Sequence, residues 1–257
     1  MAATKAAKGY GWRVFGLGVI AIGVVGVALG DFVPGQPAPK ALQDRVLLAY
    51  AAAAFMLVAG AALQWRRTTA WAAAAIALYF GVVVVGLMDL RLIPRHFREY
   101  LVYSNIAEQV AIAAGALIVF AASARLKASQ AAPLIRIGQL AFGVCAILFG
   151  GAHFFYMNFT APLVPKWLPP SQEFWGYATG IAHIAAGLAI LSGVRARLAA
   201  ILLTVMYAAF TPLVHVPLFL ADPHNHGNWA ENATNLVLTG AAWVVADSLA
   251  RRGRKSG

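Results

Sequence analysis

The sequence predicts an all-α, polytopic membrane protein built from two parallel-repeat four-helix transmembrane bundles. Apolar residues make up 61% of the 257 positions and charged residues only 11%. A soluble domain has roughly 45–50% apolar and about 25% charged residues, so this chain could not cover a water-exposed surface. The apolar residues fall into long runs, and the second half repeats features of the first. A disulfide-stabilised fold is excluded because Cys145 is the only cysteine.

The apolar runs are long enough to cross a bilayer. A hydrocarbon core about 30 Å thick needs about 20 residues of helix. The runs are rich in Ala, Leu, Val and Gly and show no strand alternation, which argues against a β-barrel. We predict eight spans, at 12–30, 45–64, 69–90, 103–124, 136–159, 173–193, 198–219 and 229–249.

The basic residues predict the orientation of the spans. The chain has 20 Lys+Arg against 9 Asp+Glu, a formal charge of +11. In a soluble protein such a charge would suggest nucleic-acid binding. Here the basic residues lie in short clusters between apolar runs, so we reject nucleic-acid binding. With the N-terminus inside, 14 basic residues lie inside: Lys5, Lys8, Arg13, Arg66, Arg67, Arg125, Lys127, Arg136, Arg195, Arg197, Arg251, Arg252, Arg254 and Lys255. Six lie outside: Lys40, Arg45, Arg91, Arg95, Arg98 and Lys166. Both termini are therefore predicted to be cytoplasmic.

An internal repeat divides the chain into two units. Residues 105–109 (NIAEQ) match 228–232 (NWAEN), and a proline lies 14 residues before the glutamate of each motif. Four spans per unit give both units the same orientation. We predict a diverged N-terminal repeat at 1–126, a C-terminal repeat at 133–250 and a basic cytoplasmic tail at 251–257. The connector is placed at Ala121–Ala132.

Prolines predict the form of the external segments. Val33–Lys40 and Ala161–Pro170 are rich in proline, which cannot continue a helix and keeps the chain extended. Each is interpreted as a rigid loop at the membrane surface, with a binding lid as the alternative.

Polar residues within the spans are the site candidates. An ionisable side chain is costly in a bilayer, so each is a functional hypothesis. Every span of the second unit carries one, and the last span adds a face of asparagines. The alternative is hydrogen bonding between helices, which stabilises a bundle without binding a ligand. The candidate ligand-binding residues are His153, His183, His215, Asn228, Glu231, Asn232 and Asn235.

A shared cavity is the most specific site hypothesis. His153, His215 and Glu231 are predicted to converge in a cavity open to the outer side of the second unit. The asparagines would line one wall of this cavity.

Metal binding is a less favoured alternative. Two histidines spaced i, i+2 beside an aspartate can bind Zn²⁺ or Cu²⁺. No CxxC or HExxH pattern supports such a site. The weak candidates for a metal are His153, His215, Glu231, Asp222, His224 and His226.

The second unit carries a set of four motifs, at 151–154 (GAHF), 163–170 (LVPKWLPP), 180–189 (GIAHIAAGLA) and 228–232 (NWAEN). With this set, about residues 138–250 resemble the DoxX-like family of bacterial four-helix membrane proteins. It implies a compact four-helix unit in the bacterial inner membrane. Some relatives are subunits of thiosulfate:quinone oxidoreductase or of other membrane redox complexes.

Three classes of function remain open. The first is a quinone-linked redox subunit, and so a candidate oxidoreductase subunit, with a quinone bound between helices and a redox partner in the periplasm or the membrane. Protonatable groups beside an apolar cavity suit that chemistry. The second is a small-molecule or ion transporter, disfavoured because no broken helices are expected at matching places in the two halves. The third is a non-catalytic scaffold or partner-binding subunit. The lipid bilayer is the surrounding partner in all three.

Overall fold

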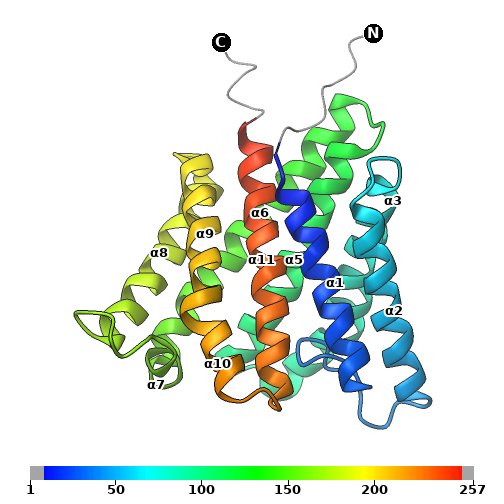
Figure 1. Cartoon of the computed structure of the whole chain (residues 1–257). Helices are drawn as coiled ribbons and strands as arrows, with labels where there is room; N and C mark the ends of the chain where they lie inside the picture. The colour runs from blue at the N-terminus through cyan, green and yellow to red at the C-terminus, as the bar shows by residue number, and fades with distance from the viewer. Residues whose placement is uncertain (1–8, 251–257) are drawn as a thin grey trace.

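The computed structural model describes residues 9–250, and every regular element in this range is a helix (Figure 1). Eight helical segments are long and apolar enough to cross a membrane, which confirms the predicted fold class. Lys5, Lys8 and the predicted basic tail at 251–257 lie outside the described residues. The elements are α1 (Gly11–Leu29), α2 (Arg45–Leu63), α3 (Thr69–Leu78), η1 (Tyr79–Asp89), η2 (Leu90–Leu92), α4 (Ile93–His96), α5 (Tyr100–Ser123), α6 (Ala128–Phe155), α7 (Met157–Thr160), η3 (Ala161–Leu163), α8 (Gln172–Ser192), α9 (Ala196–Phe210), η4 (Thr211–His215), α10 (Val216–Ala221) and α11 (His226–Ala250).

Local sequence sets where the long helices end. Gly30 follows α1 with φ 62° and Gly193 follows α8 with φ 84°, the left-handed conformation that glycine adopts without a Cβ penalty. Ser171 begins α8 by accepting a hydrogen bond from the backbone N–H of Phe174 at 3.1 Å. These residues fix where the chain turns at each membrane surface.

The connector between the two halves is shorter than predicted. The predicted stretch was Ala121–Ala132, but α5 continues to Ser123 and α6 begins at Ala128. The Gln130 side chain accepts a hydrogen bond from the Lys127 backbone N–H at 3.1 Å, which satisfies one of the free donors at the helix start. The polar composition of this stretch therefore reflects a helix cap near the surface and not an extended linker.

The helices pack in the same order in both halves. Within each half, α1 packs on α2 as α6 packs on α8, and α3 packs on α5 as α9 packs on α11. Between the halves, α1 packs on α11, α5 packs on α6, and α5 meets α11 in the centre. The last helix of each half thus lies against the first helix of the other. The division into repeats at 1–126 and 133–250 stays a prediction, and the two halves share extensive interfaces.

Small residues permit the close approach of α1 and α11. A Cβ at Gly18 would lie 2.4 Å from the Cα of Val237, and a Cβ at Gly240 would lie 2.2 Å from the backbone nitrogen of Phe15. Backbones this close gain van der Waals contact, the main force between helices in lipid.

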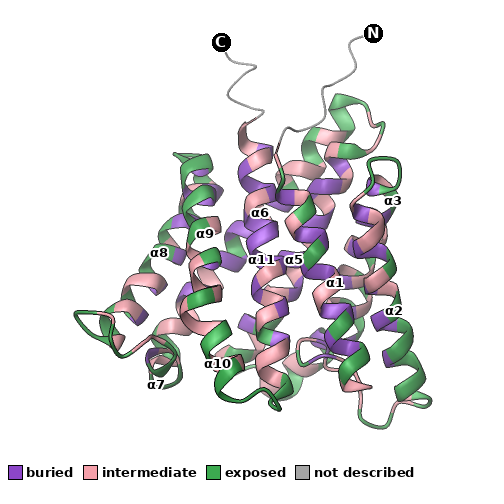
Figure 2. Ribbon diagram, in the orientation of Figure 1, coloured by how far each residue is buried: buried purple, intermediate pink, exposed green. Residues whose placement is uncertain are grey.

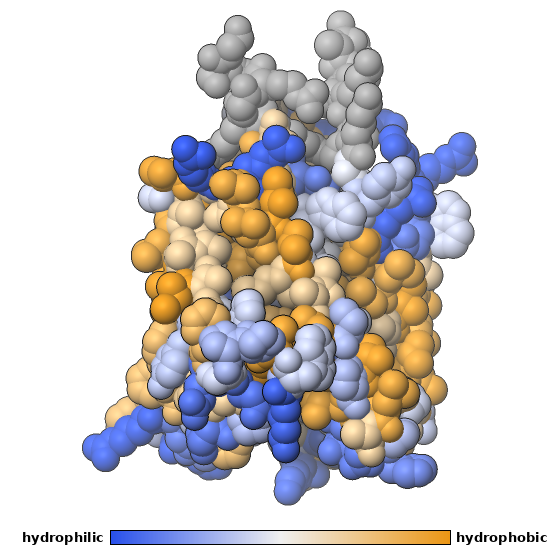
Figure 3. Space-filling model, turned by 60° about the vertical axis from the view of Figure 1, so that its left-hand side comes forward, coloured by the Kyte–Doolittle hydropathy of each residue, from blue (hydrophilic) through white to orange (hydrophobic). Residues whose placement is uncertain are grey.

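Burial separates an apolar core from an apolar exterior. The largest fully buried side chains include Phe15, Phe80 and Phe142, while Trp71 is 80% exposed. Exposed and buried positions alternate around most helices, and α11 is the most buried span (Figure 2). On the face shown in Figure 3, apolar residues form a belt, and the most hydrophilic residues gather at its two ends. This distribution fits a chain whose belt contacts lipid tails.

The third span of each half departs from α-helical winding over part of its length. In the first half α3 changes to the π-helical η1, and in the second α9 changes to the π-helical η4. Pro212 and Pro217 each lack a backbone N–H and so cannot complete the α-helical ladder of the second half. Gly81 and Gly86 weaken it in the first half. Both third spans nevertheless remain continuous helices, Thr69–His96 and Ala196–Ala221, so the argument against a transporter stays a prediction.

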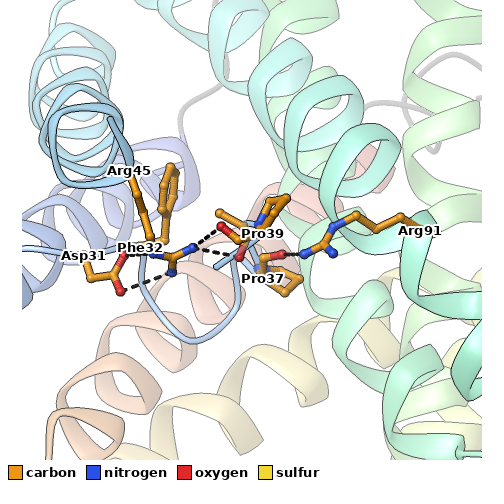
Figure 4. A network of polar contacts seen from close by, with 7 residues as sticks. Asp31, Phe32, Pro37, Pro39, Arg45 and Arg91 are labelled. Carbon is orange, nitrogen blue, oxygen red and sulfur yellow. Dashed lines mark hydrogen bonds and ion pairs between the residues drawn. The ribbon is translucent and has the colours of Figure 1, made fainter. Parts of the chain in front are cut away.

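The first proline-rich segment is held firmly against the bundle (Figure 4). The Arg45 guanidinium forms an ion pair with Asp31 at 2.9 Å and donates hydrogen bonds to the carbonyls of Ala38 and Pro39 at 2.8 Å. Arg91 donates to the carbonyl of Pro37. These contacts favour the rigid-loop interpretation over a mobile lid.

Candidate functional site

Two histidines of the second half lie side by side within the bundle. His183 in α8 is 2% exposed, and its ring centroid lies 5.3 Å from that of His153 in α6. Nδ1 of His183 donates to the carbonyl of Thr179 at 2.8 Å, and Nδ1 of His153 donates to the carbonyl of Gly176 at 3.1 Å. A carbonyl can only accept, so the proton must lie on Nδ1 in both rings. In the neutral rings, Nε2 is then the acceptor, and no residue within 9–250 donates a hydrogen bond to it.

An aromatic shell surrounds His183. The ring of Tyr207 lies 5.4 Å away, and those of Phe149 and Phe210 each lie 6.3 Å away, all measured between centroids. Tyr207 is 3% exposed, and its hydroxyl has no hydrogen-bond partner among the described residues. A buried hydroxyl without a partner costs free energy comparable to a lost hydrogen bond. The second half therefore holds a free donor and a free imidazole nitrogen in apolar surroundings.

Glycine positions bring these groups together. A Cβ at Gly180 would lie 2.8 Å from the Cβ of His153, so α8 approaches α6 closely only because this residue is glycine. Gly187 and Gly143 permit the same close approach further along the two helices, where a Cβ at Gly187 would lie 2.5 Å from the Gly143 carbonyl oxygen. The small-residue stripe on α8 is thus a packing face that also sets the distance between the histidines.

The candidate asparagines form hydrogen bonds between α11 and the third span of the second half, Ala196–Ala221. Asn235 donates to the Tyr207 carbonyl and to the Thr211 hydroxyl, both at 2.9 Å. Asn232 donates to the His215 carbonyl at 2.9 Å, and Asn228 donates to the Leu218 carbonyl at 3.0 Å. These acceptors lie in α9, η4 and α10, where the irregular winding leaves carbonyls in need of partners. The amide donors therefore serve the fold.

Glu231 lies with acids and not with the histidine pair. Glu108 in α5 is within electrostatic range of Glu231 and of Asp89 in η1. Asp89 is 2% exposed, and its Oδ2 has no hydrogen-bond partner among residues 9–250. Glu108 is half-buried and Glu231 is exposed, so of these three acids only Asp89 is fully enclosed.

The predicted convergence of His153, His215 and Glu231 gains no support from the contacts. The structure joins His153 to His183, whereas Nδ1 of His215 is buried without a partner in the described range. No hydrogen bond, ion pair or ring contact joins His153 to either of the other two residues within 9–250. The shared cavity stays a prediction, and its opening to the outer side does too.

The metal alternative has no matching geometry in the described part of the chain. Among those residues, no three His, Cys, Asp or Glu side chains form a group that could hold an ion. Asp222, His224 and His226 are exposed around the turn before α11.

Sequence reasoning missed Tyr207, Phe210, Asp89 and Thr179. Tyr207 carried a usable signal, since it is the only tyrosine after Tyr177 and lies within an apolar span. Asp89 carried a second signal, because it is an acidic residue at the end of a predicted span. Neither signal states which helix each side chain faces, because that depends on the packing.

One family model matches the chain. It is described as a domain of unknown function, DUF8561, and covers residues 142–246. That range contains the histidine pair, Tyr207 and the asparagine face of α11. No curated protein matches the chain. No solved structure matches it either.

Proposed function

We propose that this integral membrane protein is a quinone-linked redox subunit whose quinone ring binds beside His183. The observation that supports this is the pair of imidazoles with free Nε2 acceptors next to the Tyr207 hydroxyl, which has no partner in 9–250. An apolar, ring-lined site with few polar groups is typical of small-molecule binding.

The two polar groups match the two redox forms of the ligand. The Tyr207 hydroxyl would donate a hydrogen bond to a quinone carbonyl, and Nε2 of a histidine would accept one from a quinol hydroxyl. When quinol is oxidised, its protons pass to such acceptors and its electrons to a redox centre on a partner protein. Reduction of the quinone reverses both transfers. The histidines here are bases held in place by backbone carbonyls.

The resemblance to DoxX-like proteins and the charge distribution complete the proposal. Some members of that family serve thiosulfate:quinone oxidoreductase, a quinone-linked enzyme. We place the chain in a bacterial inner membrane with both termini in the cytoplasm, following the 14-to-6 division of basic residues. The first residues of α1 and the last of α11 lie at the same end of the bundle, as this topology requires (Figure 1).

Solvent extraction of the purified full-length protein tests the proposal. We expect the wild type to retain quinone, or to bind added decylubiquinone with a change in Tyr or Trp fluorescence. His183→Asn keeps a donor near the Nδ1 position but removes the Nε2 acceptor. It should lose at least tenfold in affinity, about 1.4 kcal/mol, while its unfolding temperature stays close to wild type. His224→Asn, in the exposed turn, is the control. Binding unchanged in His183→Asn would contradict the proposal.

A transporter is the second candidate, and one observation favours it. Interrupted helices at corresponding places in two repeats are typical of substrate sites in secondary transporters. Here both third spans change to π-helical winding, and Glu108 lies within electrostatic range of Asp89 in η1 and of Glu231 in α11. Proton uptake into proteoliposomes, followed with a pH-sensitive dye, distinguishes the two candidates. Flux that is lost in Glu231→Gln would support transport. If neither quinone binding nor flux is found, the scaffold role remains.

A further inference from the structure

A groove on the lipid-facing side of α8 and α9 is separate from the histidine site. Its volume is about 260 Å³, and its surface is almost wholly apolar. Ala182, Ala185 and Ala189 line it from α8, while Leu198, Leu202 and Met206 line it from α9. Alanines opposite long side chains leave the space between the two helices unfilled. The face that carries these helices belongs to the apolar belt (Figure 3).

One end of the groove is cationic. Arg195 lines it at the turn between α8 and α9, is exposed, and forms no ion pair with any residue in 9–250. Arg136 is held at the same end, where it donates hydrogen bonds to the carbonyls of Ile190 at 3.2 Å and Leu191 at 2.8 Å. Arg197 is also exposed there. Arg195 thus supplies the guanidinium at the mouth of the groove, and Arg136 and Arg197 add positive charge near the same end of α8 and α9.

The length of the groove equals one leaflet of a bilayer. Arg195 and Met206 are 11 residues apart along α9, which corresponds to about 16 Å at 1.5 Å per residue. Half of a hydrocarbon core of about 30 Å is about 15 Å. A single lipid chain that begins at the arginine end would therefore reach the middle of the membrane.

We propose that this groove binds one anionic phospholipid of the leaflet at the arginine end. The acyl chain lies between α8 and α9, and the headgroup phosphate pairs with Arg195. A guanidinium suits this role because its planar donors match a phosphate. A zwitterionic lipid would fill the groove equally well but would gain less from the three arginines. An apolar groove with a cationic mouth fits a lipid better than it fits a second copy of this basic chain.

The test compares the binding of phosphatidylglycerol with the binding of phosphatidylcholine that has the same acyl chains. Both are added to the full-length protein in neutral detergent. Native mass spectrometry counts retained lipid, and thermal unfolding reports stabilisation by binding. We expect phosphatidylglycerol to be retained preferentially. Arg195→Gln should weaken its apparent affinity by about fivefold, the effect of one basic residue near an anionic headgroup, and Arg195→Lys should restore most of it. Ala185→Leu, at an exposed position in the groove, should reduce retention of both lipids.

Two controls make the result specific. Arg67→Gln removes an exposed arginine at the corresponding turn of the first half, and Ala51→Leu enlarges an exposed alanine on α2. Both should behave like the wild type. Equal losses in Arg67→Gln and Arg195→Gln would overturn the proposal in favour of diffuse surface charge. Unchanged lipid retention in Ala185→Leu would also overturn the proposal. So would a wild type that is a dimer and an Ala185→Leu variant that is a monomer, because a second copy of the chain would then occupy the groove.

Discussion

His153 and His183 lie with their ring centroids 5.3 Å apart, and both are oriented by carbonyls of the same helix, α8. His153 belongs to α6 and His183 to α8, but the carbonyls that accept their hydrogen bonds both belong to α8. A shift of α8 along its axis would therefore move both imidazoles together. The two imidazoles thus share one helix, α8, as the source of the carbonyls that orient them.

Gly180→Ala should disturb this pair of histidines. The added Cβ would lie 2.8 Å from the Cβ of His153, which is too close, so α6 and α8 must separate. We expect a loss of about 1–3 kcal/mol of stability and a lower unfolding temperature in detergent. Gly81→Ala is the matched control, because its Cβ would meet only Ala113, at 3.9 Å. Equal stability of the two variants would show that α8 is not tightly packed here.

Asn235→Ala should weaken the packing of the third span of the second half on α11. It removes hydrogen bonds to the Tyr207 carbonyl and the Thr211 hydroxyl. Interhelical hydrogen bonds in membranes are worth about 0.6–2 kcal/mol, so we expect a loss of about 1–3 kcal/mol in reversible unfolding. Asn105→Ala, at an exposed position on α5, should change stability little. A neutral Asn235→Ala would mean that water replaces the amide.

Arg45→Gln should release the proline-rich segment. Asp31 is about half exposed, with 48% of its side chain accessible, so the ion pair itself contributes little. Most of the effect should come from the two carbonyls that lose their donor. We expect amide hydrogen exchange at 33–43 to accelerate by about fivefold, roughly 1 kcal/mol.

Arg98→Gln is the control for that exchange experiment. Arg98 forms no ion pair among the described residues. Exchange at 33–43 in this variant should match the wild type. An Arg45→Gln protein with wild-type exchange would mean that packing alone holds the segment.

Reporter fusions should establish the orientation that the basic residues predict. A reporter at the C-terminus should be active only in the cytoplasm, and one inserted next to Pro223, in the turn before α11, only in the periplasm. The opposite pattern would reverse the assignment of the two surfaces. A C-terminus opposite to the N-terminus would contradict eight spans.

Composition and run length determined the fold class and the eight spans. Ala- and Val-rich runs near 20 residues have no other stable form, because in lipid each backbone group must be satisfied within its own helix. The winding of the third spans is a feature that the run length does not give. In the second half Asn232 and Asn235 on α11 donate to carbonyls of that span, and a single run cannot reveal such partners.

The sequence by itself determined which residues were costly in a membrane, and so it named His153, His183, His215 and Glu231 as candidates. Only the tertiary structure decided their partners. It joined His153 to His183 and His183 to Tyr207, and it brought Glu231 toward Glu108 across the contact between α5 and α11. Depth along a helix can be counted from the chain at 1.5 Å per residue. The direction in which a side chain points depends on helix rotation, and that is set by where glycines let two backbones touch.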